Sequence, residues 1–499
     1  MKHKGEYMYN KPFSIVREHL YDIVTIILFF LIALVFFGAD RFVEFATDTY
    51  VTAAIGWHNT AVDSIARNGR WVIAAFYELW NAIGSSIDSF YYFSFGLAII
   101  CLTMALFVLF KMINKVVNSI LLSAIISTSI LLNPFSIEYF MFFEKGMFFL
   151  GLLFGVLSAY CYVRFIEEKK YKLLFYSFIF ELLTVFTYQP IGVMLVCLSI
   201  PFIFQNSKDC RKCFVDLCGS GLVFGISGII NLVTLKLLGS PRVGSQLSLY
   251  EKLSKMLTLG IRFIKETSGI LPKYSFLIIV VLIFAITTMV GLANGRFKSG
   301  LFKQTVLLAG VLFCSVFLAF IGDGSFEART SYCIGSIPGL LLLNYLINIS
   351  NKQEMNWVTI CTSLLVVCLL IVQYFSFQKI ISDKQTVSAK DKDRINMIGL
   401  YIDEYEKSTG NTISNVSIYR GNGITYPQYE GMFHYGSLVE SSFEHSWSDV
   451  NAINYHLGKS YTRTAEDPEI AEKFMQNDDH VFSSDQMIFD GDTLHLLVY

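Results

Sequence analysis

The chain has 499 residues, of which 54% are hydrophobic and only 16% are charged, whereas an average soluble protein carries about a quarter charged residues. This composition excludes an ordinary large soluble protein and indicates a protein embedded in a membrane. The formal net charge of −1 gives no sign of nucleic-acid binding, and no nucleic-acid partner is expected. Cys210 and Cys213 form a single CxxC pair, which is too few ligands for a usual zinc site, so neither a metal nor a cofactor is expected.

Apolar runs recur along the chain and predict about eleven spanning helices, the first of which is expected to be retained rather than cleaved. Several runs are nearer about 15 than 20 residues, so they need flanking aromatic residues to span. The fifth and sixth runs are separated only by Tyr188, Gln189 and Pro190, and form either a tight hairpin or one broken helix. The runs cover residues 23–39, 93–110, 116–132, 147–162, 173–187, 191–204, 217–238, 274–292, 306–321, 332–346 and 357–377.

The basic residues predict the orientation of these helices, because short loops rich in Lys and Arg stay in the cytoplasm. Such loops contain Lys111, Arg164, Lys212 and Arg296, and with about eleven spans all of them lie on the side of the basic N-terminus. The N-terminus is therefore predicted to be cytoplasmic, and the C-terminal end extracytoplasmic.

The first loop on the predicted outer side, residues 40–92, is the part richest in possible functional groups. Its stretches 50–66 and 71–83 have aromatic residues at helical spacing, which is typical of helices lying in the membrane interface. Asp40 and Asp48 lie just outside the first helix. Thr47 or Asp48 would make a good N-cap for the helix that follows, and capping is the simplest interpretation of Asp48.

From about Lys379 the composition becomes that of a soluble domain. We expect a membrane part at 1–378 and a soluble extracytoplasmic domain at 379–499, with an amphipathic helix over 389–408 and strands at NVSIYR and TLHLLVY. The predicted fold class is a mainly α polytopic membrane protein with a small C-terminal α/β domain.

A carboxylate at a membrane surface could act as general base on a polar acceptor while a lipid-linked donor enters from the bilayer. The leaving group would be a lipid phosphate, and Arg70, Lys145 and Arg329 are candidates to neutralise it. Further polar residues on the predicted outer side are candidate substrate contacts: Glu44, Glu138, Glu144, Tyr188 and Gln189.

Four short motifs, in this order and placement, carry a resemblance: Asp48-Thr49-Tyr50, Asn68-Gly69-Arg70-Trp71, Asn133-Pro134-Phe135 and Tyr188-Gln189-Pro190. The chain resembles the C superfamily of membrane glycosyltransferases, and within it the bacterial type II glucosyltransferase family of serotype-converting enzymes. Many superfamily members have a paired Asp-Asp in the first loop, where this sequence has Thr47-Asp48. That departure leaves open whether Asp48, Asp40 or Glu44 is the base.

The resemblance implies the substrates and partners. The donor would be undecaprenyl phosphate glucose, made by a synthase and moved across the membrane by a flippase. The acceptor would be a lipid-linked glycan, such as the O-antigen of lipopolysaccharide, on the outer face of the cell inner membrane.

Two other functions stay open. An O-antigen polymerase or ligase also has many spans, and the basic loop at 239–273 could bind its pyrophosphate-linked glycan. A transporter of lipid-linked glycans would need no chemistry, but Glu181 and Lys236 are the main charges within the apolar runs, and a coupled transporter more often has several.

Overall fold

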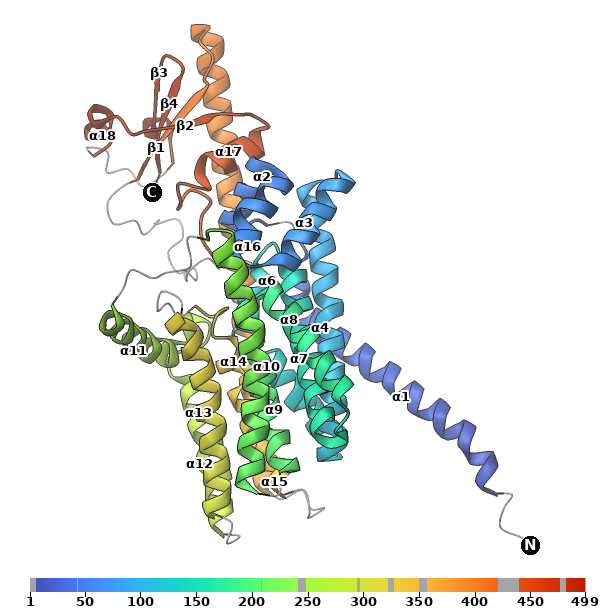
Figure 1. Ribbon diagram of the computed structural model, residues 1–499. Coiled ribbons are helices and arrows are strands. Elements are labelled where there is room, and N and C mark those ends of the chain that lie inside the picture. Colours follow the sequence, from blue (N-terminus) through green and yellow to red (C-terminus); the bar gives the residue numbers. More distant parts are fainter. Residues whose placement is uncertain are drawn as a thin grey trace.

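The computed structural model is mainly helical, with a long helical body and a small domain at one end (Figure 1). It describes residues 6–42, 44–207, 209–240, 248–293, 297–321, 327–349, 357–420, 439–475 and 482–498. We call the part from Gly410 onward the C-terminal domain, and the end of the helical body nearest to it the domain-side end.

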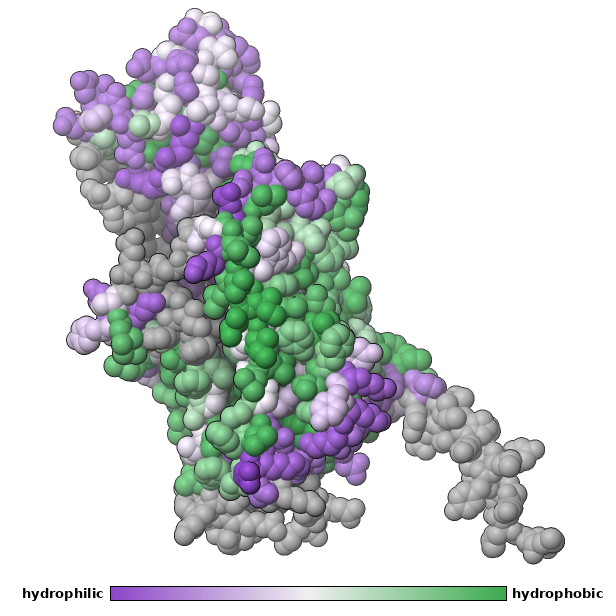
Figure 2. Space-filling model, in the orientation of Figure 1, coloured by the Kyte–Doolittle hydropathy of each residue, from purple (hydrophilic) through white to green (hydrophobic). Residues whose placement is uncertain are grey.

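Within these described residues, six helical segments are long and apolar enough to cross a membrane: His19–Arg41, Ile87–Val117, Lys145–Glu168, Gln189–Asn206, Cys210–Leu237 and Trp357–Thr409. Shorter apolar helices accompany them: Ile120–Leu131, Ser275–Met289, Gly300–Val316 and Ile337–Asn348. Figure 2 shows a broad apolar surface on the visible face of the helical body and a largely hydrophilic C-terminal domain. The prediction of a helical, membrane-embedded protein is confirmed at this level.

Every apolar run predicted from the sequence coincides with a helix. In chain order these helices are α1 (Glu6–Phe37), α4 (Ile87–Val117), α5 (Ile120–Leu131), α7 (Lys145–Glu168), α8 (Tyr171–Thr187), α9 (Val193–Asn206), α10 (Cys210–Leu237), α12 (Ser275–Ala293), α13 (Phe297–Ile321), α14 (Tyr332–Gly335) with α15 (Ile337–Ile349), and α16 (Trp357–Thr409). Local sequence sets several ends: the Ser86 hydroxyl accepts the Ser89 N–H at the start of α4, and Asp209 accepts the Lys212 N–H at the start of α10.

The fifth and sixth runs form a hairpin. Helix α8 ends at Thr187, a short 3-10 turn (η4, Gln189–Gly192) follows, and α9 turns back. A Cβ atom added at Gly192 would lie 2.8 Å from Oε1 of Glu181 and 2.9 Å from a methyl group of Val185. Such closeness is impossible in one extended broken helix, so the structure decides between the two alternatives.

The first loop folds into helices, as predicted for its two aromatic-rich stretches. It contains α2 (Thr47–Asn59), a π-helical turn η2 (Thr60–Ile65), a 3-10 turn η3 (Ala66–Asn68) and α3 (Trp71–Ile83). These elements lie at the domain-side end, close to the C-terminal domain (Figure 1). The capping interpretation is wrong, because Ala46 is the N-cap of α2 and no side chain caps the helix.

The aromatic core joins elements that are far apart in the sequence. The ring of Phe37, at the end of α1, stacks on Phe140 of α6 (Ser136–Met141) with centroids 3.8 Å apart, and lies 5.6 Å from Phe377 of α16. These contacts bring the end of α1, α6 and the last long helix together.

Helix α16 runs without interruption through the predicted boundary at residues 378 and 379, and it includes the predicted amphipathic helix. At about 1.5 Å per residue, its 53 residues are long enough to cross a membrane and continue well beyond it. One continuous helix therefore joins the membrane part to the C-terminal domain.

The C-terminal domain has a four-stranded sheet in the order β2-β1-β4-β3. The predicted strands are confirmed as β1 (Asn415–Arg420) and β4 (Thr493–Val498), which pair in parallel. Strand β2 (Thr462–Thr464) is parallel to β1, and β3 (Met487–Asp490) is antiparallel to β4. Its described residues also contain the helices α17 (Asp449–Leu457) and α18 (Pro468–Met475).

Candidate active site at the domain-side end

Asp40 and Lys145 form a buried ion pair. Their side chains are 1% and 0% exposed, and the Lys145 ammonium also donates to the Tyr91 hydroxyl at 2.8 Å. That hydroxyl donates in turn to the Asp40 carbonyl at 3.1 Å. The geometry does not fit the predicted roles, because Asp40 cannot meet an acceptor and Lys145 cannot meet a lipid phosphate without leaving this pair.

Glu44 lies just beyond this pair and is partly exposed. Burial raises its pKa from 4.5 to about 7, with Asp40 adding to the rise and Lys384 and Lys145 opposing it. Its Oε2 atom is buried and makes no hydrogen bond within the described structure. Glu44 also lines a cavity of about 330 Å³ between the first loop, α16 and α17.

Asp48 stands in the first turn of α2 with an exposed side chain. It is close to groups from three other segments. Burial raises the pKa of Glu144, and the Asp48 carboxylate adds to this rise. Burial also raises the pKa of Glu440 in the C-terminal domain to about 7, with Glu444 and Asp48 contributing. Asp48 interacts electrostatically with Arg329 as well. It is therefore an accessible carboxylate facing a mixed-charge cluster.

Arg70 lies over an aromatic ring at the edge of this cluster. Its guanidinium carbon is 4.9 Å from the ring centroid of Tyr188, and its charge lowers the pKa of Glu144. The Arg70 Nε atom is buried without a hydrogen-bond partner in the part of the chain that the structure describes. An unsatisfied buried donor is costly, so this position suits an incoming acceptor oxygen such as that of a phosphate.

The turn that carries Arg70 is fixed to the membrane helices. The side-chain amide of Asn231 in α10 donates to the Gly69 carbonyl at 2.8 Å, and that of Gln189 donates to the Asn68 carbonyl at 2.8 Å. Gly69 has φ +73, and a Cβ there would lie 2.7 Å from Asn231. Gln189 therefore positions Arg70, and its amide is already engaged rather than open to a sugar.

Glu138 holds Arg329 in place. The guanidinium of Arg329 donates to Oε1 of Glu138 at 3.0 Å, and its backbone N–H donates to Oε2. Burial raises the pKa of Glu138 to about 7, although Arg329 opposes the rise. Glu138 is 2% exposed, which makes it a positioning residue, whereas the Arg329 side chain is 29% exposed and can meet a ligand.

An aromatic wall connects the two arginines. Tyr188, beneath Arg70, meets Tyr139 edge-on with centroids 5.8 Å apart, and Tyr139 stacks on Tyr332 at 4.8 Å. The Tyr139 hydroxyl donates to the Arg329 carbonyl at 2.8 Å. Arg70 and Arg329 therefore both border one buried aromatic surface.

Sequence reasoning missed several members of this site. Tyr77 donates to Glu144 at 2.6 Å, Lys384 donates to the Met141 carbonyl at 3.0 Å, and Glu440 arrives from the C-terminal domain. Tyr139 is adjacent to Glu138, so the same segment of sequence could have identified it. No local pattern pointed to Lys384 or Glu440, because both come from distant segments.

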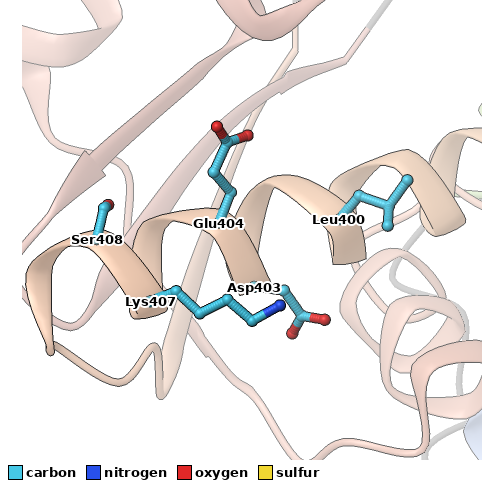
Figure 3. A pocket seen from close by; sticks show the side chains of 5 residues that line it. All are labelled: Leu400, Asp403, Glu404, Lys407 and Ser408. Atoms are coloured by element: carbon cyan, nitrogen blue, oxygen red, sulfur yellow. The ribbon is translucent and has the colours of Figure 1, made fainter.

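A second hollow, of about 420 Å³, lies on the far part of α16. Its lining residues are Leu400, Asp403, Glu404, Lys407 and Ser408 (Figure 3). They all come from one helix, where Lys407 extends toward Asp403 while Glu404 and Ser408 point to the other side, so this hollow is an open surface rather than an enclosed site.

No protein-family model matches the sequence, and no curated protein is similar to it. Among the described residues, no group of three or more His, Cys, Asp or Glu side chains is placed to hold a metal ion. The function must therefore be inferred from the geometry of the charged cluster around Asp48, Arg70 and Arg329.

Proposed function

We propose that this protein is a membrane glycosyltransferase that moves a sugar, glucose by the resemblance, from polyprenyl phosphate to a lipid-linked surface glycan such as O-antigen. The observation that supports it best is that one exposed carboxylate, Asp48, interacts electrostatically with Arg329 and with Glu144, the residue whose pKa Arg70 also lowers, at the domain-side end of the membrane helices. A base and a phosphate-binding pair are what this transfer needs.

In the proposed reaction, Asp48 takes the proton of an acceptor hydroxyl while the hydroxyl oxygen bonds to the anomeric carbon of the donor. The bond from that carbon to the phosphate oxygen breaks, and polyprenyl phosphate leaves with the electron pair. Attack from the opposite side inverts the anomeric carbon. Arg70 and Arg329 neutralise the phosphate, a type of interaction that supplies several kcal/mol in other enzymes.

The wider proposal includes about eleven spans in an arrangement like that of the C superfamily, a cytoplasmic N-terminus and an extracytoplasmic C-terminal domain in a bacterial inner membrane. A donor synthase and a donor flippase would act earlier in the same pathway. Glu440 supports a role for the C-terminal domain at the site, because it belongs to that domain and interacts electrostatically with Asp48.

The experiment is glycan analysis of the host surface polysaccharide with and without the gene. We expect the gene to add a side-branch hexose, and Asp48→Asn to lower this addition by about 10²- to 10⁴-fold, the usual contribution of a general base. Asp63→Asn is the matched control, since Asp63 is an exposed carboxylate of the same loop that is paired with Arg67.

The other outcomes separate the alternatives. Addition that survives Asp48→Asn but not Glu44→Gln would make Glu44 the base. A change in polysaccharide chain length without an added residue would favour a polymerase or ligase. Export of a glycan that is unaffected by Asp48→Asn would favour a transporter.

A further inference from the structure

Helix α11 (Leu249–Glu266) runs across the spans, near the ends of α12 and α13, rather than along them (Figure 1). Ser248 and Glu251 form a reciprocal capping box at its start, so its first turn is well defined. Its 18 residues make a rod of about 27 Å at 1.5 Å per residue. The loop at 239–273, which sequence analysis described only as basic, therefore contains a long surface helix.

Around its axis, α11 divides into three arcs when successive residues are placed 100° apart. One arc packs on the protein: Met256 and Phe263 are 5% and 4% exposed. The Phe263 ring lies 4.8 Å from that of Phe135, three residues before Glu138. This arc anchors α11 to the segment that positions Arg329.

The second arc is apolar and exposed. Its residues are between 47% and 81% exposed: Leu249, Tyr250, Leu253, Leu257 and Ile261. They recur mainly every fourth residue, so they form one continuous stripe about 18 Å long, from Leu249 to Ile261. In water such a stripe would be unfavourable, because every apolar side chain on it is left hydrated.

The third arc is charged and lies opposite the apolar stripe; it carries Lys255, Arg262 and Lys265, whereas Lys252 falls within the packed arc. The helix carries four cations, Lys252, Lys255, Arg262 and Lys265, against two carboxylates, Glu251 and Glu266. Arg262 and Glu266 pair at 3.0 Å. An apolar stripe next to a cationic arc, on a helix attached to a membrane-embedded body, matches the bilayer interface and anionic lipid phosphates.

We propose that α11 lies in the membrane–water interface, with its exposed apolar stripe among lipid acyl chains and its cations at the phosphates of anionic lipids. This inference does not depend on glycosyl transfer. It also places lipid close to the candidate site, since α11 packs against Phe135, three residues before Glu138.

Photocrosslinking of the full-length protein in lipid nanodiscs tests the apolar stripe. The crosslinker p-benzoylphenylalanine replaces Leu257 on the stripe or, as a matched control, Thr258, which is exposed on the charged arc. We expect acyl-chain adducts at position 257, detected by mass spectrometry, to exceed those at position 258 by at least about tenfold, since only the stripe faces the acyl chains. Leu253 is the second stripe position if the change at 257 prevents folding.

Two results would overturn this proposal. Crosslinks from position 257 to another part of the chain, or to a second copy, would show that protein covers the stripe. Equal lipid adducts at 257 and 258 would show that α11 has no preferred face toward the bilayer.

The charged arc is tested in nanodiscs that contain equal amounts of phosphatidylglycerol and phosphatidylethanolamine. Lys255→Gln with Arg262→Gln should lower the ratio of anionic to neutral lipid adducts at position 257, by roughly fivefold for each charge removed. Lys111→Gln with Lys115→Gln, which removes equal charge from the far end of α4, should leave the ratio unchanged. An unchanged ratio in the α11 variant would refute anionic-lipid binding.

Discussion

Substitution of Gly69 by alanine should break the link between the first loop and the membrane helices. Gly69 has φ +73, in the left-handed region, and its place leaves no room for a side chain. A Cβ atom would lie 2.7 Å from both polar atoms of the Asn231 amide and 2.9 Å from Nε2 of Gln189. Both amides would have to move, and both now hold the turn before Arg70.

The expected magnitude comes from two separate costs. An alanine in the left-handed region costs about 1–2 kcal/mol. Displacing Asn231 and Gln189 breaks two hydrogen bonds to the turn, each worth about 1 kcal/mol. Gly69→Ala should therefore destabilise the protein by about 3–4 kcal/mol and shift Arg70 away from Tyr188.

Gly84→Ala is the matched control, because Gly84 has φ +68 but no atom within 4 Å of its Cβ position. It should cost only the backbone part, about 1–2 kcal/mol. The assay is thermal unfolding of both purified variants in one detergent, together with sugar addition in cells. Equal losses of stability in the two variants, or full sugar addition by Gly69→Ala, would refute the role given to the Asn231 and Gln189 contacts.

Three further predictions follow from buried groups. Lys145→Met leaves the Asp40 carboxylate buried without its partner and should lower the free energy of unfolding by about 3–5 kcal/mol. Adding Asp40→Asn to the same chain should recover most of this loss in thermal unfolding. No recovery would contradict the pairing. Glu44 has its folded-state pKa raised to about 7, so the folded state binds its proton more tightly than the unfolded state does. Its contribution to stability should therefore fall as pH rises from about 4.5 to about 7, and Glu44→Gln should flatten that part of a stability-against-pH profile. Phe263→Ala removes a buried ring and should lower the free energy of unfolding by about 3 kcal/mol, measured by chemical or thermal unfolding. Leu257→Ala, on the exposed stripe, should change it by less than about 0.5 kcal/mol in detergent.

Local patterns predicted much of the fold. Long apolar stretches can satisfy their backbone groups in a membrane only as helices, so each run identified its helix. Alternation in NVSIYR and TLHLLVY identified β1 and β4 for a similar local reason. The domain boundary was harder, because composition changes near Lys379 while helical propensity continues, and α16 passes through unbroken.

The sequence predicted most of the residues of the candidate site, but it did not predict what each of them does there. The first loop, the segment around Glu138, the turn at Tyr188 and the region of Arg329 were each singled out by position outside the apolar runs, and the structure brings them to one end. Sequence reasoning could not tell an exposed carboxylate from a neutralised one. Asp40 and Asp48 have similar settings in the sequence, yet one is buried against Lys145 and the other is exposed.

The sequence by itself determined the class of protein, its helices and the strands of its C-terminal domain, because composition and periodicity act over a few turns of chain. Only the tertiary structure decided which charges cancel. Asp40 and Lys145 are 105 residues apart, and Arg329 and Glu138 are 191 apart. Such pairs depend on how the helices pack, and packing leaves Asp48 exposed and within electrostatic reach of Arg329.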